Sequence, residues 1–307
     1  MELRSLRYFV TVAEEGNITR AAEKLNMSQP PLTHQMQMLE EELGAQLLIR
    51  GKRRVTLTAE GTMLLRRARE LLELERKTCS EIQEMRNGIS GDLYVSMVEG
   101  RAPFLTARWI AGFTEEFPNV RYNLWNGSTD DVLERLGKGL ADVGVVAAPY
   151  NDEILDSIPV GGEPWVAIIP QKHALAQLPG WEVELRCLVG EPLIVPVRKS
   201  RKEAIRRWFG EIEAEPRFLC ETSNYLDAVA LSEQGAGISI FPQTTYTPND
   251  LVVSKEIVAP SRQAEYALVW RKDRYRSTLT EEFIHYVQDF YEEDRMHTDR
   301  FKVRDRE

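Results

Sequence analysis

Apolar side chains in the first part of the chain recur at helical spacing and predict three short helices. Leu6, Phe9 and Ala13 mark the first helix, which Gly16 ends. A second, short helix follows, and Asn17 is a candidate for its N-cap. A tight turn then leads into the third helix, so two helices joined by a short turn are expected here.

The third helix combines an apolar stripe with a polar face of unusual composition. Ser28 is its candidate N-cap, and Gly44 ends it. The stripe repeats at i, i+4, i+7 and i+11 and consists of Leu32, Met36, Leu39 and Leu43. The opposite face carries mostly short or planar hydrogen-bonding side chains, namely Pro30, Thr33, His34 and Gln37, with Gln29 at the edge. Such side chains read base edges in a major groove, which predicts a DNA-binding helix-turn-helix, with an ordinary polar face as the alternative.

Two short apolar runs come next and flank a basic turn. Residues 47–49 and 55–57 read as strands of a hairpin, and the turn between them contains Gly51. Four basic side chains and no acidic one lie around this turn: Arg50, Lys52, Arg53 and Arg54. We therefore predict a wing that contacts DNA phosphates or enters the minor groove. A basic turn that only maintains solubility is the alternative.

One long helix is expected from Ala59 to Asn87, with Thr58 as its cap and Gly88 as its end. Its apolar stripe consists of Leu64, Leu65, Ala68, Leu71, Leu72, Cys79, Ile82 and Met85. This stripe is too apolar for a lone helix in water and predicts a coiled-coil-like partner helix, and hence a homodimer. Packing of the stripe against its own chain is the alternative.

From Gly91 onward, strands alternate with helices, which predicts an α/β architecture with a largely parallel sheet or sheets. The expected strands are 93–98, 120–125, 142–147, 165–170, 193–197, 218–221, 237–241 and 266–270. Two points, Gly161-Gly162 and residues 261–264, mark places where the chain could cross between two lobes. The expected limits are 1–58 for the winged helix-turn-helix, 59–90 for the linker helix and 91–307 for the two-lobed domain, with a first lobe of 91–160 and 265–294 and a second lobe of 161–264.

The charge of the chain first argues against DNA and then limits where DNA can bind. The 307 residues carry a net charge of -9, which as a bulk value disfavours a phosphate partner. Residues 91–307 alone sum to -10, whereas residues 44–58 sum to +4. The acidity thus belongs to the C-terminal part, and the expected wing is basic.

Other function classes are disfavoured by missing motifs. The sequence contains no GxxxxGK[ST], HExxH or GxSxG motif, its three cysteines lie far apart, and its four histidines do not cluster. We therefore expect no catalytic residues, metal or cofactor. A secretory signal is not recognisable, and no apolar run approaches the roughly 18 to 20 residues that span a bilayer, so a cytoplasmic location without a membrane partner is expected.

Candidate ligand-binding residues follow the predicted strands of the C-terminal part. In α/β lobes, ligands bind at the carboxyl ends of strands, where helix N-termini present free N–H groups. Four such strand ends supply the candidates Glu99, Gly100, Arg101, Ser128, Thr129, Ser200, Arg201 and Ser223. The hydroxyl side chains could instead only cap helices, and Ser200 with Glu203 fits a capping box. A guanidinium such as that of Arg101 suits a carboxylate, which favours a small anionic metabolite.

Residues 1–60 resemble the winged helix-turn-helix of the LysR-type transcriptional regulators. The matching runs are 6–10, 21–25, 28–35, 39–44 and 57–61. The resemblance implies DNA contacts from Gln29, Pro30, Thr33 and His34 and from the wing residues Arg50, Lys52, Arg53 and Arg54. His34 stands where the family often has Arg.

The resemblance also implies a C-terminal effector domain like a two-lobed periplasmic binding protein. The expected function is sequence-specific binding to an inverted-repeat operator, modulated by a small molecule held between the lobes. Expected partners are double-stranded DNA, further copies of the chain as a homodimer or a tetramer built as a dimer of dimers, a small-molecule effector and RNA polymerase. Two alternatives are a redox-responsive regulator that senses through Cys187 and Cys220, and a small-molecule binding protein that does not bind DNA.

Overall fold

The computed structural model forms two compact units, Met1–Arg86 and Asn87–Glu307, each with its own hydrophobic core. It describes residues 1–51, 54–87, 89–244 and 250–304. Within those residues, none of the helices is both long enough and apolar enough to span a membrane.

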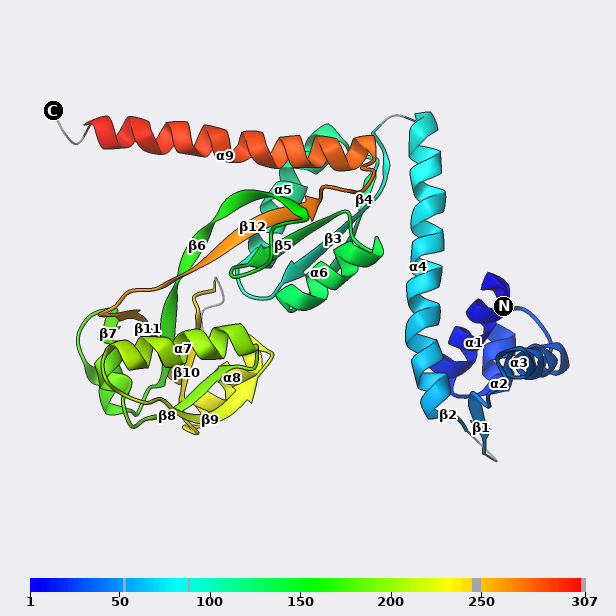
Figure 1. Cartoon of the computed structure of the whole chain (residues 1–307), viewed down its shortest axis with the longest axis horizontal. Coiled ribbons are helices and arrows are strands. Elements are labelled where there is room, and N and C mark those ends of the chain that lie inside the picture. Colours follow the sequence, from blue (N-terminus) through cyan, green and yellow to red (C-terminus); the bar gives the residue numbers. More distant parts are fainter. Residues whose placement is uncertain (52–53, 88, 245–249, 305–307) are drawn as a thin grey trace. The chain divides into compact units, whose positions relative to one another are not determined.

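The first unit is a helical domain with a small antiparallel hairpin. Its elements are α1 (Leu3–Glu15), α2 (Ile18–Lys24), α3 (Gln29–Leu43), β1 (Leu48–Arg50), β2 (Val55–Leu57) and α4 (Ala59–Asn87) (Figure 1). The side chain of Asn17 accepts hydrogen bonds from the backbone N–H groups of Thr19 and Arg20, which confirms it as the cap of α2. The Thr58 hydroxyl likewise accepts from Gly61 N at the start of α4.

The predicted cap at Ser28 is wrong in its chemistry. Ser28 occupies the N-cap position of α3, but its side chain makes no capping hydrogen bond. A cap normally accepts from the backbone N–H of the second or third helical residue. Here those residues are Pro30 and Pro31, which have no N–H. The prolines start α3 by fixing the backbone and remove the donors that a cap would use.

The apolar stripe of α4 is divided between two environments. Leu64 and Ala68 are buried in the core of the first unit, so the alternative of packing against the same chain holds for this part. Arg7 donates two hydrogen bonds to the carboxylate of Glu75, at 2.6 and 2.7 Å, and ties α1 to α4. Further along, Ile82 is 59% exposed. The distal part of the stripe therefore remains available to another surface.

Gly61 is the point where α4 approaches the backbone before β1 most closely. A Cβ at this position would lie 2.1 Å from the carbonyl oxygen of Leu47. We expect Gly61→Ala to lower the free energy of unfolding of the first unit by about 1–3 kcal/mol, because the backbone must shift to admit the methyl group. Urea denaturation followed by far-UV circular dichroism measures this change. Met63→Ala, on an exposed side chain of the same turn, should stay within about 0.5 kcal/mol of the parent, and equal effects of the two changes would contradict the close approach.

The second unit is an α/β domain whose strands follow the order β4-β3-β5-β12-β6-β10-β8-β9, with β11 pairing with β6 and β7. Its strands are β3 (Gly91–Val98), β4 (Val120–Gly127), β5 (Val143–Ala147), β6 (Leu155–Pro170), β7 (Glu182–Glu184), β8 (Pro192–Pro196), β9 (Arg217–Thr222), β10 (Ile238–Pro242), β11 (Val252–Val258) and β12 (Gln263–Arg271). Its α-helices are α5 (Ala102–Glu116), α6 (Thr129–Lys138), α7 (Lys199–Glu211), α8 (Tyr225–Glu233) and α9 (Thr278–Arg304), with 3-10 turns at Ala174–Gln177 and Leu185–Leu188.

Two lobes share this domain. We call the first lobe β3, β4, β5, β12 and residues 155–164 of β6, with α5, α6 and α9. The second lobe is residues 165–170 of β6, strands β7 to β11, and α7 and α8. Strands β6 and β12 run side by side between the lobes, and their residues contribute to one continuous core (Figure 1).

The expectation of largely parallel sheets is wrong for the strands that connect the lobes. Strand β3 pairs in parallel with β4 and β5, and β8 with β9 and β10, but β12 is antiparallel to β5 and β6, and β6 is antiparallel to β10 and β11. Strand β6 also begins at Leu155, ten residues before the expected start at 165. Gly161-Gly162 lies inside this strand, where the register with β12 shifts between Glu265 and Ala267 and Gly161 has a φ of 102°, which is typical of a bulge.

Candidate functional site

Helix α3 presents the polar face that the sequence predicts. Its side toward the core buries Leu32, Met36 and Leu39. The residues Gln29, Pro30, His34 and Gln37 are exposed, whereas Thr33 is half-buried and its hydroxyl oxygen is covered. This face of α3 thus exposes the polar side chains of Gln29, His34 and Gln37, which a major groove can accept.

Gln29 is held in place by the preceding helix. The Thr19 hydroxyl donates a hydrogen bond to the side-chain oxygen of Gln29 at 3.2 Å. The amide NH₂ group of Gln29 then has no partner among the described residues and is available to donate. A side-chain amide that donates is suited to acceptors such as purine N7 or guanine O6 on a base edge.

The wing follows α3 and is fixed to it by one carboxylate. Strands β1 and β2 pair in the register Leu48↔Leu57, and Gly51 N donates to the Arg54 carbonyl at 2.9 Å. Glu40 in the last turn of α3 accepts from Leu47 N at 2.8 Å and from Leu48 N at 2.9 Å. Because these bonds fix where the hairpin starts, they set its direction relative to α3.

Of the four predicted basic wing residues, the structure shows one side chain. Arg54 is exposed. Lys52 and Arg53 lie outside the described residues, as does the side chain of Arg50. Their contacts with DNA stay predictions.

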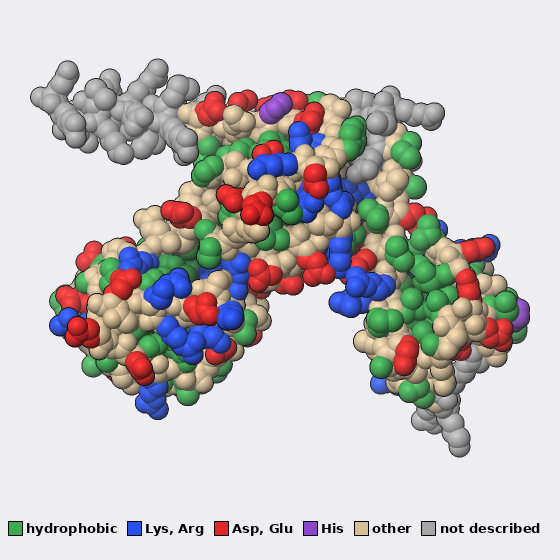
Figure 2. Space-filling model, viewed as in Figure 1, with side chains coloured by type: hydrophobic (Ala, Val, Ile, Leu, Met, Phe, Trp, Pro, Cys, Tyr) green, Lys and Arg blue, Asp and Glu red, His purple; other side chains and the backbone are tan. Residues whose placement is uncertain are grey.

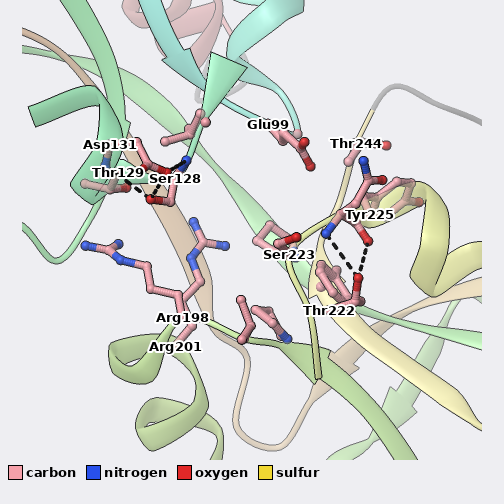
Figure 3. Close-up of a pocket in the computed structure, with 18 of the residues that line it drawn as sticks. Glu99, Ser128, Thr129, Asp131, Arg198, Arg201, Thr222, Ser223, Tyr225 and Thr244 are labelled. Atoms are coloured by element: carbon pink, nitrogen blue, oxygen red, sulfur yellow. Dashed lines mark hydrogen bonds between the residues drawn. The ribbon is translucent and has the colours of Figure 1, made fainter. Parts of the chain in front are cut away.

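In the second unit, a cavity of about 310 Å³ opens where the carboxyl ends of five strands converge (Figure 3). The lining comes from the ends of β3 and β4 in the first lobe and from the ends of β8, β9 and β10 in the second. Tyr266 of β12 also lines it. Such a position, with helix N-termini facing the space, is typical of ligand sites in α/β domains.

Six of the eight predicted ligand residues surround this cavity: Glu99, Gly100, Ser128, Thr129, Arg201 and Ser223. Arg101 and Ser200 are not among its lining residues. Arg101 forms an ion pair with Glu163, and burial raises the pKa of the Glu163 carboxyl while the guanidinium opposes that shift. Ser200 lies in the first turn of α7, which begins at Lys199 after Arg198, so the predicted capping box of Ser200 with Glu203 is wrong.

The hydroxyl groups around the cavity differ in what they are free to bind. Ser128 and Asp131 form a capping box at the start of α6. The Thr129 hydroxyl is buried and donates to the Ala147 carbonyl at 3.2 Å. Ser223 was expected to cap α8, but Asn224 is the cap and accepts from Leu226 N at 2.7 Å. Ser223 therefore keeps its hydroxyl available to the cavity.

Two arginines of the second lobe reach the cavity, and they are held differently. Arg198 donates to the Asp130 carboxylate and to the Pro149 carbonyl, both at 3.1 Å, and so bridges the two lobes. Arg201 makes no ion pair with any described residue, and its guanidinium lies over the Trp165 ring at 5.5 Å from the centroid. Burial lowers the pKa of Arg201, and the nearby Tyr266 hydroxyl opposes this shift. An arginine nevertheless stays protonated at neutral pH.

Arg198 and three other lining residues, Tyr225, Thr244 and Tyr266, were not among the predicted site residues. The end of β10, which leads to Thr244, follows the same strand-end rule as the other four ends and could have been included. Arg198 belongs to a basic run at residues 198–207, and such a run is usually a solvated helix face; its members are Arg198, Lys199, Arg201, Lys202, Arg206 and Arg207. Lys and Arg side chains do gather on the surface over α7, among them the exposed Lys199 and Arg206 (Figure 2). The strand-end rule selected Arg201 from this group, but the sequence shows no signal that separates Arg198 from the other basic residues.

The positions of the cysteines and of the possible metal ligands complete the description of the site residues. In the part of the chain that the structure describes, no group of three or more His, Cys, Asp or Glu side chains is placed to hold a metal ion. Cys79, Cys187 and Cys220 are free thiols, and Cys220 is half-buried.

Comparisons with known proteins agree with both units. A family model described as a bacterial regulatory helix-turn-helix protein of the lysR family matches residues 3–62, and the model of the LysR substrate binding domain matches residues 86–292. The HTH-type transcriptional regulator BsdA of Bacillus subtilis is 30% identical over 290 residues, which cover 92% of this chain and 99% of BsdA.

Solved structures give the same result. The crystal structure of CbnR, a LysR family transcriptional regulator, matches with a TM-score of 0.76 at 26% identity and covers 94% of this chain and 99% of that chain. Full-length CbnR in complex with its target DNA matches with a TM-score of 0.75 at 27% identity over the same shares.

Proposed function

The chain belongs to the LysR family of bacterial transcriptional regulators, and on this premise we propose how its parts divide the work. Residues 1–58 bind DNA, residues 59–90 pair two copies, and residues 91–307 bind a small effector between the lobes. The observation that carries the proposal is the exposed first turn of α3, with Gln29 held by Thr19 and its amide group free to donate. The chain acts by binding and not by catalysis, in the cytoplasm where its operator lies.

Pairing of two copies through α4 follows from the divided stripe. Leu71 and Leu74 are exposed by 40% and 39%, and Ile82 by 59%, along one helix. A partner α4 that covers these side chains would place two α3 helices on one DNA molecule. Two identical DNA-binding domains related by a twofold axis would recognise an inverted repeat. Two linked half-sites also give far higher affinity than one. A tetramer would be a dimer of such dimers, and RNA polymerase would be the partner that the bound regulator contacts.

The effector is proposed to hold an anionic group beside Arg201. That guanidinium has no carboxylate partner among the described residues, and the neighbouring Ser223 hydroxyl is not used by a helix cap. Arg198 bridges the lobes through Asp130, so a ligand in the cavity competes with or completes that bridge. Differential affinity of the ligand for two lobe arrangements then shifts the regulator between two states.

Binding of the full chain to DNA from upstream of its own gene tests the proposed function. We expect fluorescence anisotropy to show an affinity that falls by about 10³-fold or more between 50 and 200 mM salt, if the dimer neutralises about six phosphates through its wings and helices. DNA of equal length with one half-site scrambled should bind much more weakly. Absent binding, or affinity that does not change with salt, would contradict the proposal.

A further inference from the structure

The cavity between the lobes is balanced in charge. Its lining includes two carboxylates, Glu99 and Asp131, and two guanidinium groups, Arg198 and Arg201. Asp131 is engaged in the capping box with Ser128, and Arg198 pairs with Asp130. The remaining two charges, Glu99 and Arg201, have no oppositely charged partner among the residues that the structure describes.

The two unpaired charges come from opposite lobes. Glu99 follows the end of β3 in the first lobe, and Arg201 lies in the first turns of α7 in the second lobe. Figure 3 shows the Glu99 side chain on one side of the cavity and the side chains of Arg198 and Arg201 on another. A molecule between them meets a negative group at one end and a positive group at the other.

Glu99 is exposed and Arg201 is half-buried, so a ligand in the cavity can reach both charges, and each of them favours a ligand group of the opposite charge. A carboxylate beside a guanidinium forms strong charge-assisted hydrogen bonds, and the same holds for an ammonium group beside a carboxylate. A ligand with negative groups at both ends would place one of them against Glu99, where like charges repel. Ligands that carry only negative groups are therefore disfavoured on the side of the cavity where Glu99 lies.

Cavity size and wall chemistry limit the ligand further. A volume of about 310 Å³ lies at the lower end of the range of about 300–1,000 Å³ for small-molecule sites. The walls between the two charges are mixed, with Tyr225 and Phe241 beside the hydroxyls of Ser223 and Thr244. A compact molecule with a short apolar or polar body fits this surface.

We propose that the effector is a small zwitterion of the amino-acid class, with its carboxylate beside Arg201 and its ammonium group beside Glu99. The inference rests on the proposed function of this cavity as the effector site. The sequence predicts an anionic metabolite as effector. The proposal adds that this metabolite also has a cationic group, because Glu99 lies where it can bind one.

Matched ligand series test the class directly. The probes are the proteinogenic amino acids, each with its deamino acid (hydrogen in place of the ammonium group) and its 2-hydroxy acid. Thermal unfolding of the full chain, followed by tryptophan fluorescence, reports on the second unit because all six tryptophans lie at position 109 or later. Titration calorimetry then gives the affinity of each stabilising compound.

We expect at least one amino acid to bind about tenfold or more tightly than its deamino and 2-hydroxy counterparts, since only the ammonium group pairs with Glu99. Glu99→Gln should lower the affinity for that amino acid by about tenfold, whereas the affinity for its deamino acid should stay the same or increase. Glu115→Gln, which removes an exposed carboxylate of α5 outside the cavity, is the matched control and should change neither affinity.

Each other outcome overturns the proposal in a distinct way. If the deamino or hydroxy acids bind as tightly as the amino acids, the zwitterion class is wrong while the cavity remains an effector site for acids. If none of the three series binds and operator binding is intact, both the ligand class and the proposed effector role of Arg201 fail, and the proposed DNA-binding function stands.

Discussion

Replacing Gln29 with alanine is expected to weaken operator binding by about tenfold to a hundredfold at each half-site. Residues at the N-terminus of a recognition helix contact base edges, and each good base contact is worth about 1–3 kcal/mol. In the proposed dimer the change occurs twice, so the effect on the whole operator is the product of two such losses. Because Gln29 is uncharged, the dependence of affinity on salt should keep its slope.

Anisotropy titrations of the parent and Gln29→Ala chains at several salt concentrations measure both quantities. Glu41→Gln is the matched control, since it changes an exposed side chain near the far end of the same helix and should cause no loss of affinity. An unchanged affinity of Gln29→Ala, or a loss accompanied by reduced helical circular dichroism, would contradict a direct role in reading the operator.

Phe9→Ala is expected to lower the free energy of unfolding of the first unit by about 3–5 kcal/mol. Phe9 is fully buried in the core that helices α1 to α4 share, and truncation of a buried phenylalanine leaves a cavity that relaxes only in part. Domains of this kind are stable by only about 5–15 kcal/mol, so much of the first unit's stability would be lost. Operator binding should fall with it.

The second unit should be unaffected by the same change, because the two cores are separate. Urea denaturation tests this when far-UV circular dichroism and tryptophan fluorescence are recorded together, since every tryptophan belongs to the second unit. Tyr8→Phe removes only the hydroxyl that accepts from Arg4 and should cost about 1 kcal/mol or less. A fluorescence transition that shifts with the dichroism in Phe9→Ala would show that the units unfold together.

The helix-turn-helix could be predicted from the sequence because its determinants are local. The stripe of α3, the cap at Asn17 and the end at Gly44 each act over a few residues. The error at Ser28 is also local, since the two prolines that remove its partners stand in the sequence. The wing strands were predictable for the same reason.

The cavity was predictable only in outline. The strand-end rule brought Glu99, Ser128 and Ser223 to one place, but the fate of each side chain depends on neighbours that are distant in sequence. Thr129 is engaged by Ala147, and Arg198 by Asp130, through contacts that only the folded sheet creates. The first part of β6, from Leu155, was missed because it forms by pairing with β12, which lies far along the chain.

The antiparallel pair of β6 and β12 that connects the lobes has a consequence for how such regulators could diversify. Pro164 and Gln263 are register partners, so the whole segment between them leaves the first lobe and returns to it at adjacent points. A contiguous segment with neighbouring ends can be exchanged as a cassette without rethreading the rest of the chain. Transplanting residues 165–262 from a relative would replace Arg198, Arg201 and Ser223 in one step. Glu99 and α3 would be retained, and with α3 the proposed operator specificity. If the cavity is the effector site, as proposed, recombination at these two adjacent strand positions would connect one operator sequence to a different effector.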